Sequence, residues 1–331
     1  MVIRCNKILS LVIIALFFIM LIFSSTLALG VNNGLNLSLN VVIPSLFPFT
    51  VLSIMFIKSG GFYYLSKMLG IKISIWLISA IGGYPAGALI LKELENSLDK
   101  KFIKRAVFFS VNAGPSFVIY AVAINIFNNI KIGIFLLAAH LISSFLFCVF
   151  TPGSKTVNIK IPTYLPPFDL FFSSLETALK SILKICGIII VISSFFEIIK
   201  TYDFLKYPVL FLEVSVGIEK ANKNLYLIAF LLSFSGLSVI MQIKMILNNY
   251  INFGLCVIYR ILHGTATVFI LKILLYFCPL SIPTISNGVP FLNKLNYISI
   301  TSGMALIFMC LVFIMQILRQ KNNREISRLE F

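Results

Sequence analysis

Charged side chains are scarce in this chain. Only 11% of its 331 residues are Asp, Glu, Lys or Arg, against about 25% in an ordinary soluble domain. No charged residue occurs between Lys7 and Lys58. A soluble protein of this length would need many more charges to cover its surface. The composition therefore argues against a soluble enzyme and predicts an all-α, polytopic membrane protein.

Motifs for catalysis and metal binding are also missing from the sequence. The chain has two histidines, His140 and His263, and none of its six cysteines lies in a CxxC pair. This spacing argues against a zinc site or a disulfide framework. No P-loop, nucleophile elbow or paired-carboxylate pattern occurs either. We therefore expect no enzyme activity, no catalytic residues, no metal site and no resident cofactor.

Long apolar runs make up most of the chain, which is 59% hydrophobic. A helix needs about 20 apolar residues to cross a bilayer. On this basis we expect about eight transmembrane helices, near residues 8–29, 39–57, 106–127, 132–150, 185–199, 225–247, 253–277 and 298–318. Arg4 and Lys7 precede the first run, which is longer than a typical signal-peptide core, so we expect a retained helix.

The distribution of basic residues predicts the topology. Lysines and arginines cluster in the stretches 58–72 and 92–105, on both flanks of the apolar segment 73–91. Because basic loops stay in the cytoplasm, this segment is predicted to enter and leave the membrane on one side, as a re-entrant hairpin. Its tip is predicted at the residues that favour a helix break, Gly82, Gly83, Pro85 and Gly87.

A second re-entrant segment is predicted at 207–217, entering from the opposite face. With both termini cytoplasmic, most of the 27 lysines and arginines then lie inside. We attribute the net charge of +16 to this topology and not to nucleic-acid binding. The arrangement predicts an inverted repeat. The chain is then expected to have a transmembrane helix and linker at 1–38, a first repeat at 39–150 and a cytoplasmic linker with an amphipathic segment at 151–184. A second repeat is expected at 185–250, followed by C-terminal transmembrane helices with a basic tail at 251–331.

Polar residues interrupt the apolar segment 106–127. Asn112 and Ser116 are one helical turn apart, and Gly114 and Pro115 between them favour unwinding. Broken helices of this kind bind solutes and ions in transporters. The alternative is a kinked helix whose polar groups satisfy one another.

The second half carries a corresponding set of polar and small residues, which interrupt the apolar segment 225–247 around Gly236. A carboxylate within an apolar segment is costly unless it finds a partner, and Glu213 follows Phe211-Leu212. It either binds a cation, a proton or a polar solute, or it lies at a hairpin tip in headgroup water. The predicted solute-binding residues of this half are Glu213, Ser215, Gly217, Ser235, Ser238 and Gln242.

Arg260 and His263 lie three residues apart within a predicted span. An arginine at that depth nearly always pairs or faces water. We expect an intramembrane pair beside the solute path, with Glu213, or else Glu197, as the acidic partner. The alternative is a purely structural pair.

Five motifs in this order resemble the YlbJ-like sporulation integral membrane proteins, which carry nucleoside-recognition (Gate) domains. The motifs are Pro44-Ser45-Leu46-Phe47-Pro48-Phe49, Gly82-Gly83-Tyr84-Pro85-Ala86-Gly87, Asn112-Ala113-Gly114-Pro115-Ser116, Leu212-Glu213-Val214-Ser215-Val216-Gly217 and Ser235-Gly236-Leu237-Ser238 with Gln242. The chain departs from the family pattern at Ser110-Val111 and at Ser235-Gly236, where the family has more polar residues and a glycine pair.

The resemblance implies a multi-pass cell-membrane protein of spore-forming bacteria, with Gate-like repeats, that is needed to make the spore and its cortex. We expect it to transport a small polar solute, with sodium or protons as the open choices for a coupling cation. The expected partners are the lipid bilayer, the solute and other sporulation membrane proteins, with no nucleic acid; an oligomer is compatible with these features. One alternative hypothesis is a membrane scaffold that transports nothing. Another is a lipid-processing enzyme, which is less favoured because clusters of His, Asp and Glu are missing.

Overall fold

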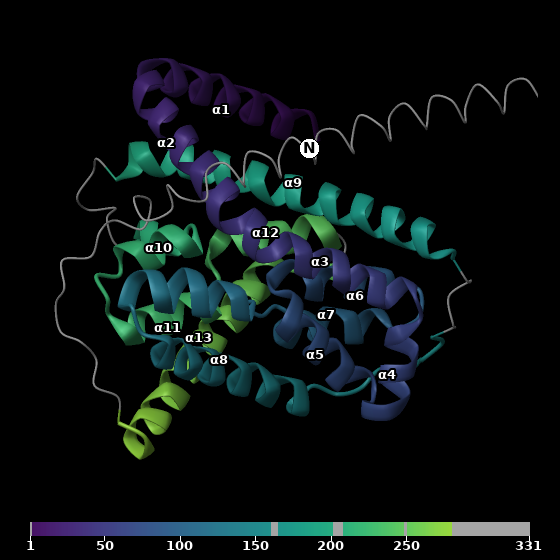
Figure 1. The fold of residues 1–331 in the computed structure, drawn as a ribbon. Helices are drawn as coiled ribbons and strands as arrows, with labels where there is room; N and C mark the ends of the chain where they lie inside the picture. Colours follow the sequence, from purple (N-terminus) through teal and green to yellow (C-terminus); the bar gives the residue numbers. More distant parts are fainter. Residues whose placement is uncertain (1, 160–164, 201–207, 248–249, 280–331) are drawn as a thin grey trace, which may run out of the picture.

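The structure is a computed structural model, and it describes residues 2–159, 165–200, 208–247 and 250–279. All regular elements in these ranges are helices, which confirms the all-α prediction (Figure 1). In chain order they are α1 (Val2–Ile22), α2 (Ser24–Leu37), the π-helix η1 (Ser38–Val42), α3 (Ile43–Lys58), α4 (Gly61–Leu69), α5 (Ile71–Gly82), α6 (Tyr84–Glu93), α7 (Lys100–Ser110), the π-helix η2 (Phe117–Phe127), α8 (Ile130–Phe150), α9 (Pro167–Ile199), the 3-10 helix η4 (Pro208–Phe211), α10 (Val214–Lys220), α11 (Leu225–Phe234), α12 (Gly236–Leu247) and α13 (Phe253–Phe277).

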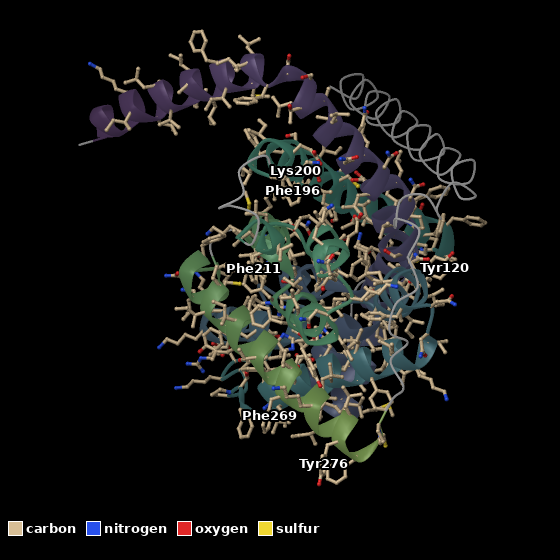
Figure 2. The ribbon with its side chains drawn as sticks, turned by 90° about the vertical axis from the view of Figure 1, so that its left-hand side faces the viewer. Tyr120, Phe196, Lys200, Phe211, Phe269 and Tyr276 are labelled. Carbon is tan, nitrogen blue, oxygen red and sulfur yellow. The ribbon has the colours of Figure 1, made fainter. Side chains whose placement is uncertain are left out.

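Five helical segments of the described chain are long and apolar enough to cross a membrane. They are Ser24–Lys58, Ile130–Phe150, Pro167–Ile199, Leu225–Leu247 and Phe253–Phe277. Their outer faces carry large apolar side chains, as for Phe269 and Tyr276 of α13, which are 66% and 83% exposed and point away from the bundle (Figure 2). Such a surface is compatible with lipid contact.

Several boundaries differ from the predicted ones. Residues 30–38, expected in a linker, are helical, because α2 continues through the π-turn η1 into α3. Similarly, α9 begins at Pro167 and includes much of the stretch expected to be a linker before 185. The predicted span 298–318 lies outside the described residues.

Helices α2 and α9 pack closely along each other, which explains why residues 30–38 are ordered as helix. A Cβ built on Gly30 would collide with the backbone of Ser194, and one on Gly34 would collide with the backbone of Ile190. Two glycines four residues apart let membrane helices approach to backbone contact. The spacing of Gly30 and Gly34 therefore fixes where α2 crosses α9.

Helices α5 and α6 are too short to cross a bilayer alone, with 12 and 10 residues. At 1.5 Å per residue each extends about 18 Å or less, against a hydrocarbon core of about 30 Å. The chain reverses between them at Gly83, whose φ of 79° is a conformation that favours glycine. A Cβ on Gly87 would lie 3.0 Å from the Cβ of Ser79, so α6 folds back against α5.

Candidate functional site

Two helices of the bundle are interrupted where the sequence predicts breaks. Helix α7 ends at Ser110, and the chain is non-helical through Gly114 before it continues into the π-helix η2. Between α11 and α12, Ser235 has a φ of 68° and Gly236 a φ of 74°. A non-glycine residue in this left-handed region costs about 1–3 kcal/mol and is often found at functional sites.

Each interruption is contacted by a reversal of the chain that precedes it. At the first, the backbones of Gly83 and Gly114 are so close that a Cβ on Gly114 would lie 3.3 Å from the Cα of Gly83. At the second, a Cβ on Gly236 would lie 3.3 Å from the Cα of Glu213, and the N–H of Ser238 donates to the carbonyl of Leu212 at 2.9 Å. Four segments of the chain thus meet at the two breaks.

Arg260 of α13 joins the two breaks. Its Nη1 donates to the carbonyl of Val111 at 3.0 Å, and its Nε donates to the carbonyl of Phe234 at 3.4 Å. The interruption of each helix frees these carbonyls from their usual partners. The side chain is fully buried, so a single guanidinium satisfies backbone acceptors from both halves of the chain.

The prediction that Arg260 pairs with an acidic residue is wrong. Among the described residues Arg260 forms no ion pair with Glu213 or Glu197. Glu213 instead accepts the N–H of Val216 at 2.8 Å and caps α10, while Glu197 pairs with Lys200. The reason is local, because each carboxylate already lies beside a donor of its own helix. The arginine donates instead to the backbone carbonyls at the two breaks.

A chain of hydrogen bonds links the first break to the second half. The backbone N–H of Ala113 donates to His140 Nε2 at 2.9 Å. Because Nε2 accepts, the ring proton is on Nδ1, which donates to Ser233 Oγ at 2.7 Å. Ser233 Oγ contacts Thr267 Oγ1 at 2.6 Å, and Thr267 also contacts Ser143 Oγ at 2.7 Å. His140 is therefore a neutral link between four elements.

His263 lies against His140. The two imidazole rings are 4.9 Å apart, and His263 Nε2 contacts the carbonyl of His140 at 3.4 Å. The predicted pair of Arg260 and His263 shares one buried face of α13, but each side chain has its own partners.

Asn112 and Tyr84 connect the first hairpin to both breaks. Asn112 Nδ2 donates to Ser79 Oγ at 2.8 Å and to the carbonyl of Phe109 at 3.0 Å. The hydroxyl of Tyr84, the first residue of α6, donates to the carbonyl of Leu232 at 2.7 Å. Residues near the tip of α5 and α6 therefore reach from the first half to the second.

Several buried polar atoms near the breaks have no hydrogen-bond partner in the structure. They are Ser110 Oγ, Asn112 Oδ1, Ser238 Oγ, Arg260 Nη2 and His263 Nδ1. An unsatisfied buried polar group costs about 1–3 kcal/mol, and such groups in native proteins are few. Their concentration here marks the region as a candidate site for a polar ligand.

The other predicted site residues form no hydrogen bond with Asn112, whose partners are Ser79 and Phe109. Ser116 is half-buried at the start of η2, Ser215, Gly217 and Gln242 are buried, and Ser235 Oγ donates to the carbonyl of its neighbour Phe234. Gly82 and Pro85 are buried at the turn between α5 and α6. A shared wet cavity between Asn112 with Ser116 and the residues of the second half stays a prediction.

A cavity of about 290 Å³ approaches the breaks along α13. Its walls include Lys104 and Phe108 of α7, Asn252 before α13, and Cys256. Cys256 is one helical turn from Arg260, and both are buried on α13. The lining of the cavity thus includes Cys256 but not Arg260.

Sequence reasoning missed Ser79, Tyr84, Ser143, Ser233 and Thr267, and considered His140 only as a zinc ligand. The available signal was their polarity: His140, Ser143 and Ser233 all lie within predicted apolar spans. The hydrogen-bond partner of each residue depends on tertiary packing, which the sequence does not show.

Comparison with known proteins finds one curated relative of note. The chain is 31% identical over 122 residues to the sporulation integral membrane protein YlbJ of Bacillus subtilis (strain 168). The match includes 33% of this chain and 30% of that protein's length. No family model and no solved structure matches the chain. The match supports the predicted resemblance to YlbJ-like proteins.

Proposed function

We propose that this chain is a multi-pass cell-membrane protein used in sporulation, and that it moves a small polar solute through a site formed by its two broken helices. The sporulation role rests on the relative's name together with the five apolar segments that are long enough to cross a membrane. The transport role rests on the geometry at the breaks. The observation that carries it is the buried Arg260, which holds carbonyls of both breaks.

The order of the elements supports an inverted repeat. In the first half, the long helix of Ser24–Lys58 is followed by the reversal α5–α6, the broken helix α7–η2 and the long helix α8. The second half has the long helix α9, the reversal η4–α10, the broken helix α11–α12 and the long helix α13. Paired short or interrupted segments in two halves are typical of secondary transporters. On this proposal the second repeat extends to the end of α13.

The unsatisfied polar atoms at the breaks support a ligand site over a simple kink. Non-helical backbone at membrane depth persists where protein or water satisfies it. Here Asn112 Oδ1, Ser238 Oγ and Arg260 Nη2 are buried without protein partners, so a hydrated solute would satisfy them. Glu213, at the second break, is the residue we propose for a coupling cation.

A non-transporting scaffold for assembly of the spore envelope is the second candidate. The observation that favours it is the satisfied chain from Ala113 through His140 and Ser233 to Thr267. A kink used only for packing also satisfies its own polar groups in this way. The two candidates differ in what Asn112 and Glu213 do.

Spore formation by point variants tests the transport proposal. We expect Asn112→Ala and Glu213→Gln to reduce the number of heat-resistant spores while membrane abundance stays near wild type. The matched control is Asn129→Ala, which removes an exposed cap of α8 outside the site. Normal sporulation by both site variants at normal abundance would favour the scaffold.

A further inference from the structure

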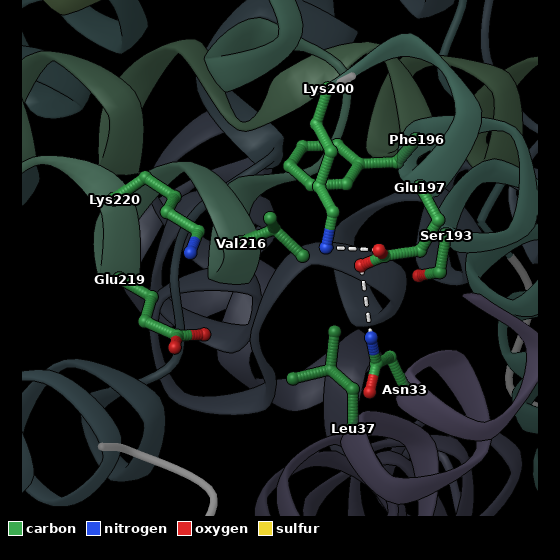
Figure 3. Close-up of a pocket in the computed structure, with 9 residues that line it drawn as sticks. All are labelled: Asn33, Leu37, Ser193, Phe196, Glu197, Lys200, Val216, Glu219 and Lys220. Atoms are coloured by element: carbon green, nitrogen blue, oxygen red, sulfur yellow. Dashed lines mark hydrogen bonds and ion pairs between the residues drawn. The ribbon is translucent and has the colours of Figure 1, made fainter. Parts of the chain in front are cut away.

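A second cavity, of about 160 Å³, lies away from the helix breaks, between α2, the C-terminal end of α9, and α10. Its apolar lining residues are Leu37, Phe196 and Val216. Charged side chains reach into it from two sides (Figure 3). Lys200 directly follows the candidate span Pro167–Ile199, and basic residues at the end of a span are typical of the membrane–headgroup boundary.

One wall holds a fixed carboxylate. Glu197 is only 6% exposed, and its Oε1 accepts a hydrogen bond from Asn33 Nδ2 at 2.9 Å. Its Oε2 pairs with Lys200 (Figure 3). Asn33 comes from α2 and Lys200 from the end of α9, so the carboxylate is held from two directions and has little freedom to move.

The facing wall carries a second acid and a second base. Glu219 and Lys220 of α10 lie across the cavity from Glu197 and Lys200 (Figure 3). On the first wall Ser193 also lines the cavity, and its buried Oγ has no hydrogen-bond partner in the structure. A buried hydroxyl without a partner is costly and indicates that this wall is built to contact a polar group.

From this arrangement we propose that the cavity binds an aminoethyl phosphate group, as a free zwitterion or as a lipid headgroup. Two acids and two bases make the lining neutral overall, which favours a ligand with one charge of each sign. The primary ammonium lies between Glu197 and Glu219, and the phosphate contacts Lys200 and Lys220. A cavity of about 150 Å³ holds a six-membered ring, so this one has room for about eight non-hydrogen atoms.

Two probes applied to the full-length purified protein test the proposal. Calorimetric titration with phosphoethanolamine tests the free zwitterion, and native mass spectrometry with added phosphatidylethanolamine tests the headgroup. Phosphocholine and phosphatidylcholine are the matched controls, because a trimethylated ammonium cannot donate hydrogen bonds to the two carboxylates. We expect saturable binding of one molecule of at least one primary-amine probe, at least tenfold tighter than its choline counterpart.

Substitutions locate that binding in the cavity. Glu197→Gln and Lys220→Gln are both expected to weaken it at least tenfold. Lys220 is exposed, so its variant remains informative if the buried substitution impairs folding. The control is Lys180→Gln, which removes an exposed ion pair with Glu176 on α9 and should leave binding unchanged. Failure of both primary-amine probes to bind, equal binding of the choline probes, or wild-type binding by Lys220→Gln would overturn the proposal.

Discussion

Replacing Arg260 with methionine removes the donor that the two helix breaks share. The guanidinium donates to the carbonyls of Val111 and Phe234, at 3.0 Å and 3.4 Å. Methionine fills a similar length without any donor, so both carbonyls lose a partner inside the bundle. We expect the two broken helices to be held together less firmly and the free energy of unfolding to fall.

The magnitude follows from the two contacts. A buried acceptor that is left without a donor costs about 1–3 kcal/mol. The carbonyl of Val111 is left in this state, whereas the carbonyl of Phe234 keeps the hydroxyl of Ser235 as a donor. The 3.4 Å contact with Phe234 contributes less than the 3.0 Å contact with Val111. Removing a buried charge without an acidic partner offsets part of the loss. We therefore expect the free energy of unfolding to fall by about 1–2 kcal/mol.

Titration with SDS in mixed micelles measures this free energy of unfolding. Arg260→Lys keeps the charge and one donor group, so it should lose less than Arg260→Met. Lys272→Met on the same helix is the control: Lys272 is exposed and lies 5.6 Å from the ring centroid of Tyr226, a contact that contributes about 1 kcal/mol or less. If Arg260→Met is as stable as Lys272→Met, the bridge has no structural role and the reasoning fails.

Two further predictions concern helix packing and capping. Gly30→Ala should lower the free energy of unfolding by about 1–3 kcal/mol, because its Cβ would meet the backbone of α9. The control Gly187→Ala on α9 meets open space and should be neutral or stabilising by up to about 1 kcal/mol. SDS titration compares the two variants, and equal effects would contradict the close crossing of α2 and α9. Asp99 Oδ1 accepts the N–H of Phe102 at 2.7 Å, a hydrogen bond that lowers the pKa of this carboxyl. Its stabilising contribution is thus present above the unfolded pKa of about 4 and is lost as pH falls through the lower folded pKa. Asp99→Ala should cost about 1 kcal/mol at pH 7, and the difference from wild type should shrink in thermal melts below pH 4; a difference that grows on acidification would contradict the cap.

The positions of the chain breaks could be predicted because their causes are local. Gly114-Pro115 and Ser235-Gly236 interrupt apolar runs. The chain is non-helical at 111–114, directly before Pro115, and left-handed at Ser235 and Gly236. Gly83 likewise forms the turn between α5 and α6. Residues 30–38 are predicted as a linker because they lie between the spans expected at 8–29 and 39–57, whereas packing of Gly30 and Gly34 against α9 stabilises a helix there.

The partners of Arg260 could not be predicted from residue types. A buried arginine suggests a carboxylate, and Glu213 and Glu197 were the available candidates. The real acceptors are backbone carbonyls of Val111 and Phe234, which every residue carries and which only the fold frees. The same holds for His140, because its acceptor role depends on the N–H of Ala113 being left without a helical partner.

Metabolite profiling of the sporulating host tests the central claim most directly. Wild type, a deletion strain and the deletion strain complemented with Asn112→Ala would be compared for small polar solutes in mother cell and forespore. The account predicts that one solute accumulates on one side in the deletion strain, that the wild-type gene restores its distribution, and that Asn112→Ala at normal abundance does not. An unchanged solute distribution in the deletion strain, with full rescue of sporulation by Asn112→Ala, would contradict transport through the two broken helices.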